Sequence, residues 1–305
     1  MRPLVPAVLS VALALSSCAR TPQAEAFDGK RAYEWVQRQV AFGPRTPGTA
    51  AHDSCFADLV RGLHESAEVV EVDTFHYESP DLGKNLRLMN VLARFRPSEP
   101  RRILLAAHWD TRPWADRDPD STKRNLPILG ANDGASGVGV LMALAEQMKR
   151  RSPQLGVDIA LFDGEDLGTE KNTNGYFRGS KRYVEWRSNE PPPLFVVVID
   201  MVGRKEASFY WEGNSYEQAS NIVLLVWNKA KSLGLRQFKN GVKFSISDDH
   251  IPFLQNQIPA IDVIDFEFPQ WHTHGDVLSV VDPATLEAVG RVLQNLVSEA
   301  DFLSN

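Results

Sequence analysis

Apolar residues recur along this chain with two different periods, and the two periods alternate. Residues Lys30 to Val40 carry an apolar stripe with the spacing of one helix face, and a second such stripe begins near Ala50. Residues Glu68 to Tyr77 instead alternate apolar and polar side chains, which is typical of an edge strand. Residues Ile103 to Ala107 are all apolar, which indicates a strand buried on both faces.

The same alternation continues toward the C-terminus. Further strands are predicted at residues 90–95, 157–162, 195–199 and 260–264, and further helices at 137–148, 217–233 and 283–303. Strands separated by helical segments indicate an α/β protein. The sequence has no internal repeat, low-complexity block or linker after residue 28. We therefore predict a single α/β domain with a central, mostly parallel mixed β-sheet and helices on both faces.

The N-terminal residues have the pattern of a targeting signal. Arg2 supplies a positive charge, and residues Leu4 to Leu15 are free of charge. This run is shorter than the roughly 20 residues of a membrane-spanning helix, but it fits a signal-peptide core. The run ends in Leu15-Ser16-Ser17-Cys18, which resembles the bacterial lipobox. The alternative interpretation is an ordinary signal peptide that is cleaved nearby, with Cys18 as an incidental cysteine. We expect a lipoprotein signal peptide at 1–17, a tether at 18–28 and the folded domain at 29–305.

A lipid on Cys18 would place the protein in the bacterial cell envelope, attached to the membrane through this anchor alone. Cys55 would then have no partner, so we predict no intramolecular disulfide. Two cysteines in 305 residues also exclude a disulfide scaffold.

The overall charge narrows the class of partner. The chain has 33 Lys and Arg against 39 Asp and Glu, a net charge of −6. Nucleic-acid binding normally needs a basic surplus or a basic stripe, and the sequence has neither. We therefore expect no nucleic-acid partner.

Chemically active side chains follow the predicted strands. Because the carboxyl ends of parallel strands meet at one edge of a sheet, we expect these side chains to lie together. Gathering so many carboxylates is costly without a cation, and nitrogen and oxygen ligands without thiolates suit a catalytic zinc ion. Each residue alone is weak evidence, and Asp133 could instead cap the next helix. The residues are His108, Asp110, Asp133, Asp163, Glu165, Asp166, Asp200 and His272.

Several motifs, in order along the chain, resemble those of the M28 zinc aminopeptidase superfamily. They are His108-x-Asp110, Gly130-Ala131-Asn132-Asp133-Gly134-Ala135, Gly164-Glu165-Asp166, Asp200 and His272-Thr273. Two more motifs resemble the glutaminyl-peptide cyclotransferase branch of that superfamily, especially its bacterial members. These are Asp248-Asp249-His250-Ile251-Pro252-Phe253-Leu254 and Phe268-Pro269-Gln270-Trp271-His272-Thr273, and Phe42-Gly43-Pro44-Arg45 fits as well.

The resemblance implies that residues 29–305 form a catalytic zinc domain with one Zn²⁺ ion. Its activity would be the cyclisation of N-terminal glutamine in peptides or proteins to pyroglutamate, with release of ammonia. The implied zinc ligands are Asp133, Asp166 and His272, although the family more often has Glu at the second position. We expect a monomer whose partners are peptide N-termini that begin with glutamine.

The resemblance also assigns roles to residues around the metal. Glu165 matches the proton shuttle, and Asp200 and Asp248 match the acidic partners that hold it. Trp271 and Phe268 would line the substrate pocket, although Trp271 could instead be a core residue. Animal relatives have a pocket tryptophan soon after the shuttle, but residues 167–173 contain no aromatic residue, so Tyr176 and Phe177 are the candidate replacements.

Two alternatives remain open at this point. A two-zinc aminopeptidase would use His108 and Asp200 for a second ion, with Asp133 bridging and Asp110 orienting His108. A non-catalytic envelope binding protein is the third hypothesis. Of the other histidines, His52, His64 and His76 are expected at the surface, His250 either braces the acidic cluster or packs in the core, and His274 is an exposed neighbour of the site.

Overall fold

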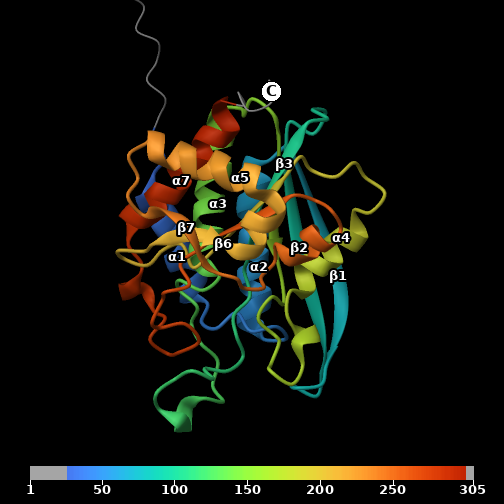
Figure 1. Ribbon diagram of the computed structural model, residues 1–305. Helices are drawn as coiled ribbons and strands as arrows, with labels where there is room; N and C mark the ends of the chain where they lie inside the picture. The colour runs from blue at the N-terminus through green and yellow to red at the C-terminus, as the bar shows by residue number, and fades with distance from the viewer. Residues whose placement is uncertain (1–25, 300–305) are drawn as a thin grey trace, which may run out of the picture.

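The computed structural model describes residues 26–299, which form one α/β domain around a six-stranded sheet (Figure 1). The strand order is β1-β2-β4-β3-β5-β8. The predicted signal peptide lies outside the described residues, as does most of the predicted tether. The strands are β1 (Val69–Ser79), β2 (Lys84–Phe95), β3 (Arg102–His108), β4 (Gly156–Phe162), β5 (Val196–Asp200) and β8 (Ala260–Ile264).

The sheet is mixed, as predicted. Strands β4, β3, β5 and β8 pair in parallel, whereas β2 is antiparallel to both β1 and β4. The carboxyl ends of the four parallel strands therefore meet at one edge of the sheet. β1 is an edge strand, as its alternating pattern predicts.

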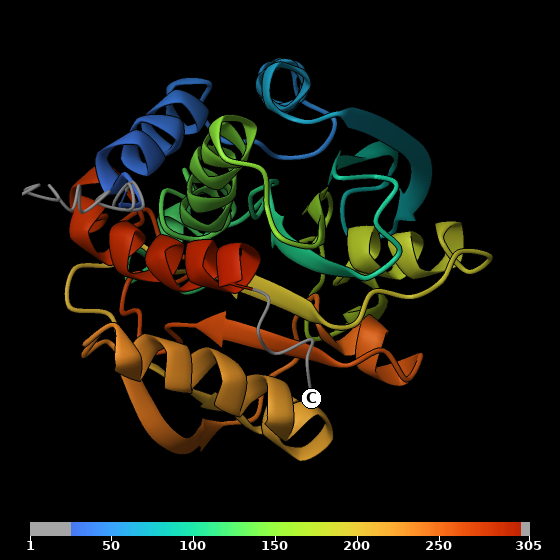
Figure 2. The same cartoon turned by 90° about the horizontal axis from the view of Figure 1, so that it is seen from above.

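Helices cover both faces of the sheet (Figure 2). On one face α3 (Ala135–Arg150) packs against β3, β4 and β5, with α1 (Gly29–Ala41) and α7 (Pro283–Glu299) against it; α2 (Ala50–Ser66) contacts β1 and β2. The other face is covered by α4 (Arg178–Trp186) and α6 (Ile251–Gln255). Beside β8 lie α5 (Gly213–Ser232) and a two-stranded sheet of β6 (Phe209–Glu212) and β7 (Phe238–Phe244).

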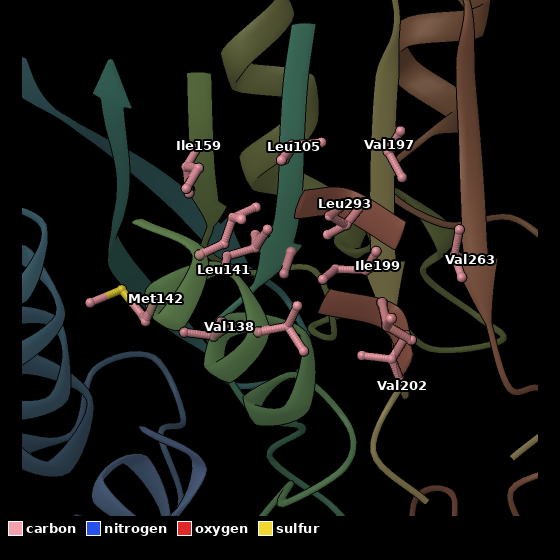
Figure 3. Packing of buried hydrophobic residues seen from close by; sticks show 14 of the residues in the cluster. Leu105, Val138, Leu141, Met142, Ile159, Val197, Ile199, Val202, Val263 and Leu293 are labelled. Atoms are coloured by element: carbon pink, nitrogen blue, oxygen red, sulfur yellow. The ribbon is translucent and has the colours of Figure 1, made fainter. Parts of the chain in front are cut away.

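Each central strand is buried on both sides because its alternate side chains enter two different cores. Leu105 of β3 and Val197 of β5 face the same core as Leu141 of α3 (Figure 3). Leu104 and Ala106, their neighbours on β3, enter the core beneath α4 and α6. The uninterrupted apolar runs in the sequence correspond to these doubly buried strands.

The structure corrects several sequence-based boundaries. The strand predicted at 90–95 begins at Lys84, and the short elements α4, α6, β6 and β7 were not predicted. Phe27, assigned to the tether, is only 3 % exposed and lies in the main core. The Asp28 carboxylate accepts hydrogen bonds from the first turn of α1, so the folded domain includes both residues.

Two further sequence expectations concern the cysteines and the membrane. Cys55 is buried with a free thiol, while Cys18 lies outside the described residues. Among residues 26–299 no helix has the length and apolar character needed to cross a membrane.

If Phe27 is a core residue, shortening it must destabilise the domain. The variant Phe27→Ala should lower the free energy of unfolding by about 3 kcal/mol, because it leaves a cavity against α7. Urea denaturation measures this loss, and Leu126→Ala, at a residue that is 52 % exposed, is the control. An unchanged unfolding midpoint for Phe27→Ala would show that Phe27 does not contribute to the core and belongs to the tether.

Candidate active site and metal centre

The predicted site residues gather at the carboxyl edge of the parallel strands. His108 ends β3 and Asp200 ends β5, and both side chains are nearly buried. Glu165 and Asp166 lie in the loop after β4, and His272 lies in the loop after β8. The long connections between strands thus bring together residues that lie up to 164 positions apart in the sequence.

Two groups of ligand atoms form at this edge, and they share Asp133. The first is the predicted set Asp133, Asp166 and His272, and the second is His108, Asp133 and Asp200. In each group the ligand atoms lie within 4.8 Å of one another. His272 Nε2 lies 3.4 Å from Asp166 Oδ1, and His108 Nε2 lies 3.2 Å from Asp200 Oδ1.

The residues fit a zinc ion. All five side chains in the two groups are buried, and they offer only imidazole nitrogens and carboxylate oxygens, the ligand types of catalytic zinc. Asp166 Oδ2 is a buried oxygen with no hydrogen-bond partner. An orphaned acceptor of this kind is costly unless a cation binds it.

Asp133 acts as a candidate ligand and does not cap a helix. The residue at the N-terminal cap of α3 is Gly134, and no side chain caps this helix. Gly134 has φ +84°, and a Cβ atom there would lie 2.9 Å from His108 Cε1. Glycine is therefore required where this turn passes close to the His108 ring.

Asp110 follows β3 and contacts the loop after β4. One of its carboxylate oxygens accepts a hydrogen bond from the backbone N–H of Glu165 (3.1 Å) and lies 3.5 Å from His108 Nδ1. Asp110 therefore holds the loop after β4 close to the His108 ring.

Two buried charged residues hold the loop that carries Asp133. Arg45 is fully buried and donates hydrogen bonds to the carbonyls of Trp109 (3.0 Å) and Gly130 (2.8 Å). Asp276 accepts hydrogen bonds from the backbone N–H groups of Asn132 and Asp133. Arg45 is the last residue of the motif Phe42-Gly43-Pro44-Arg45. Its bonds explain why this motif accompanies the site residues although it lies far from them in sequence.

Sequence reasoning missed a buried arginine between two acids at the metal site. Arg112 donates to Asp166 Oδ1 (2.7 Å) and to both carboxylate oxygens of Asp116 (2.9 and 2.7 Å). Asp116 Oδ1 lies 3.3 Å from His272 Nδ1, the nitrogen that faces away from the ligand group. A carboxylate at this nitrogen orients a metal-binding imidazole and strengthens it as a ligand. The available signal was an arginine placed between acidic residues in the segment 110–120.

The Glu165 carboxyl lies among other acids. Burial, with Asp166 and Asp248 adding to it, holds the pKa of Glu165 well above its usual range. Burial and the nearby Asp200 likewise raise the pKa of Asp248 to about 6. Carboxylates packed this closely resist simultaneous ionisation, which favours the protonated form of Glu165; a bound cation would oppose this effect.

A cavity of about 420 Å³ opens above these groups. Its floor contains the carboxylates Asp133, Glu165, Asp166, Asp200 and Asp248, together with His272. Its walls include two aromatic pairs. The ring centres of Trp271 and Phe266 are 5.1 Å apart, and those of Tyr176 and Phe177, the two candidate replacements for the missing tryptophan, are 5.6 Å apart.

Phe268 does not line this cavity, contrary to the sequence prediction. It is 4 % exposed and packs with Met201 and Ile264 in the cluster that supports the wall. Phe266, two residues earlier, is the lining residue instead. The backbone loops out between β8 and His272, so position in the motif did not indicate which phenylalanine faces the cavity.

Left-handed backbone conformations cluster around the cavity. Phe177 (φ 58°), Met201 (φ 47°) and His272 (φ 58°) all line it, although none is glycine. Such conformations cost free energy and persist where the surrounding structure enforces them, as at functional sites.

His52 is buried, contrary to the surface position predicted for it. Its Nε2 lies 3.0 Å from both carboxylate oxygens of Asp163, and its ring stacks on Trp109 at 4.3 Å. Asp163 also accepts a hydrogen bond from the backbone of Met89. His64 and His76 are exposed, as predicted.

Comparison with known proteins agrees with this geometry. Residues 90–297 match the model of peptidase family M28. The chain belongs to this family.

The M28 chain has relatives that are named for two activities. It is 27 % identical over 277 residues to a glutaminyl-peptide cyclotransferase of Drosophila melanogaster, covering 82 % of this chain and 75 % of the relative. Among solved structures, a Tannerella forsythia glutaminyl cyclase superposes with a TM-score of 0.85 at 36 % identity, covering 90 % of this chain and 99 % of that one. A Zn-dependent exopeptidase from Parabacteroides distasonis gives 0.87 at 34 % identity, with coverage of 91 % and 100 %.

The Asp116 carboxylate can be tested as a support for metal binding. Asp116→Asn removes the charge at His272 Nδ1 and should weaken zinc binding roughly 10- to 100-fold, the range typical of such partners. Competition with a chromogenic chelator measures the zinc affinity directly, without reference to activity. Asp120→Asn, on the same loop but bonded to Thr122, is the control. Equal zinc affinity in Asp116→Asn and the unmodified protein would rule out this role.

Proposed function

We propose that this M28 protein cyclises N-terminal glutamine residues of peptides or proteins to pyroglutamate and releases ammonia. The observation that carries this proposal is Glu165, a carboxyl of raised pKa at the floor of an aromatic-walled cavity and beside Asp248. The similarity to glutaminyl cyclases over nine-tenths of the chain supports it.

In this reaction Glu165 moves a proton. The substrate's own α-amine attacks its γ-amide carbon, so the enzyme needs no serine or cysteine nucleophile, and holding the two groups together supplies much of the rate enhancement. Glu165 accepts a proton from the amine and delivers it to the departing nitrogen. A group with a pKa near the working pH performs both transfers well. Burial and the charges of Asp166 and Asp248 raise the pKa of Glu165 above its usual range, toward neutral pH.

One zinc ion held by Asp133, Asp166 and His272 would polarise the γ-amide carbonyl and stabilise the oxyanion that develops there. The support for an ion at this group is the buried Asp166 oxygen without a partner and the Asp116 carboxylate behind His272. The flat walls formed by Trp271, Tyr176 and Phe177 suit a narrow side chain such as glutamine.

A two-zinc aminopeptidase is the second candidate, because the group His108, Asp133 and Asp200 is geometrically intact. An aminopeptidase would hydrolyse the first peptide bond with a metal-activated water. Asp248 beside Glu165 has no evident task in that reaction, and this favours the cyclase.

Removing the acidity of Glu165 tests its role. Glu165→Gln keeps the size of the side chain but removes the proton shuttle, so turnover of a Gln-Ala peptide should fall by at least about 100-fold, the contribution typical of general acid–base catalysis. Ammonia release measures turnover, and zinc content by mass spectrometry should stay unchanged. Glu170→Gln, exposed on the same loop, is the control. Residual activity within a few-fold of the unmodified protein would refute the shuttle.

His108 distinguishes the two candidate reactions. In a one-zinc cyclase His108→Ala removes only a neighbour of the metal, so zinc per chain should remain near one and activity should fall modestly. In a two-zinc aminopeptidase the same change removes a ligand, so the metal content should fall by one ion and activity should collapse. Metal analysis and turnover on the same sample decide between them.

We also propose that Cys18 carries a lipid and anchors the protein in the bacterial cell envelope. The support is the apolar run that ends in Leu15-Ser16-Ser17-Cys18. Expression of the full chain with a radiolabelled fatty acid should label the unmodified protein and leave Cys18→Ser unlabelled. Absence of label in both proteins would favour an ordinary signal peptide.

A further inference from the structure

An exposed arginine stands beside the aromatic wall of the cavity. The guanidinium carbon of Arg117 lies 4.4 Å from the centre of the Trp271 ring, a cation–π contact. The backbone N–H of Arg117 donates to the carbonyl of His272 (3.2 Å), which ties the arginine's segment to the metal-site loop. Arg117 is thus held next to two residues that line the cavity while its charge stays in water.

Arg117 has no acidic partner among residues 26–299. The acids nearest to it in sequence have other partners. Asp116 accepts a hydrogen bond from Arg112, and Asp118 is hydrogen-bonded to the backbone N–H and the ring of His274. Asp120 bonds Thr122 and pairs with Lys123. An exposed cation that forms no ion pair with the described residues, and whose nearest acids in sequence have other partners, is free to attract an anion from solution.

The position of Arg117 indicates which anion would reach it. A substrate's first residue enters the cavity toward Glu165, so the rest of the peptide must leave past the walls, of which Trp271 is one. On another wall the Lys181 ammonium lies 5.7 Å from the Phe177 ring. The cavity floor is acidic, whereas these two walls carry cations on their aromatic rings.

From this arrangement we propose that Arg117 forms a subsite for an acidic side chain in the second or third residue of the substrate. The inference rests on the proposed cyclisation and narrows its substrate class to peptides with Gln followed closely by Glu or Asp. The carboxylate would pair with the guanidinium at the surface. Since pairs of this kind are weak and screened by salt, the preference is expected to be modest and to fade as ionic strength rises.

The test compares kcat/KM for four peptides of equal length, Gln-Glu-Ala-Ala, Gln-Ala-Glu-Ala, Gln-Ala-Ala-Ala and Gln-Lys-Ala-Ala. The unmodified protein should favour at least one Glu peptide over the alanine peptide by about threefold at low salt, the scale of an exposed ion pair. Arg117→Gln should abolish this ratio, and Arg117→Glu should invert it in favour of the lysine peptide. Arg117→Lys should retain part of it.

The control is Arg101→Gln, because Arg101 is also exposed but precedes β3 at the opposite edge of the sheet. It should leave every ratio unchanged. If Arg117→Gln lowers kcat/KM equally for all four peptides, Arg117 only supports Trp271, and the subsite is refuted. Equal rates for all peptides in the unmodified protein would also refute it but leave the cyclase intact. Failure to cyclise any of them would overturn both.

Discussion

The mutual repulsion of buried carboxylates is the constraint that the rest of this site must satisfy. Asp110, Asp133, Asp166 and Asp200 all lie at the carboxyl edge of the sheet, with Glu165 and Asp248 beside them. Desolvation and like charge would drive such groups to take up protons unless cations compensate. The protein supplies the buried guanidinium of Arg112, and the two ligand groups that contain His108 and His272 can hold a metal ion.

The negative charge of some carboxylates is compensated more fully than that of others, and this difference gives Asp166 and Glu165 different chemical roles. Asp166 is in direct contact with His272 and Arg112, and these contacts hold its pKa below the usual range despite burial. Glu165, one residue away, faces other acids and has a raised pKa. Adjacent residues therefore provide a charged metal ligand and a proton carrier, because each side chain leaves the loop toward different neighbours.

The sequence allowed the prediction of features that depend on periodicity and local order. The doubly buried strands and the long helices were predicted because apolar runs and helix-spaced stripes are local signals. α4 was missed because RGSKRYVEW is mostly polar and is buried through only one narrow face. β6 has only four residues, and every residue of β7 is half-buried or exposed, so no apolar run marks either strand.

Residues at the site were predictable where they follow a strand, and not where contact depends on how a loop folds back. His108, Asp200 and Glu165 belong to the first kind. Arg112, Asp116 and Phe266 belong to the second, since loop paths of many residues decide where their side chains lie. His52 was assigned to the surface because its partner, Asp163, is 111 residues away. Long-range pairing of polar groups leaves no period in a sequence.

The central claim is that the protein removes the γ-nitrogen of an N-terminal glutamine and leaves the peptide chain intact. The most direct test uses a Gln-Ala-Ala-Ala peptide with ¹⁵N in the glutamine γ-amide and follows the product by mass spectrometry, with and without a chelator. The account predicts labelled ammonia and an intact chain lacking that nitrogen, both dependent on the metal. Free glutamine that retains the label would contradict it and identify an aminopeptidase.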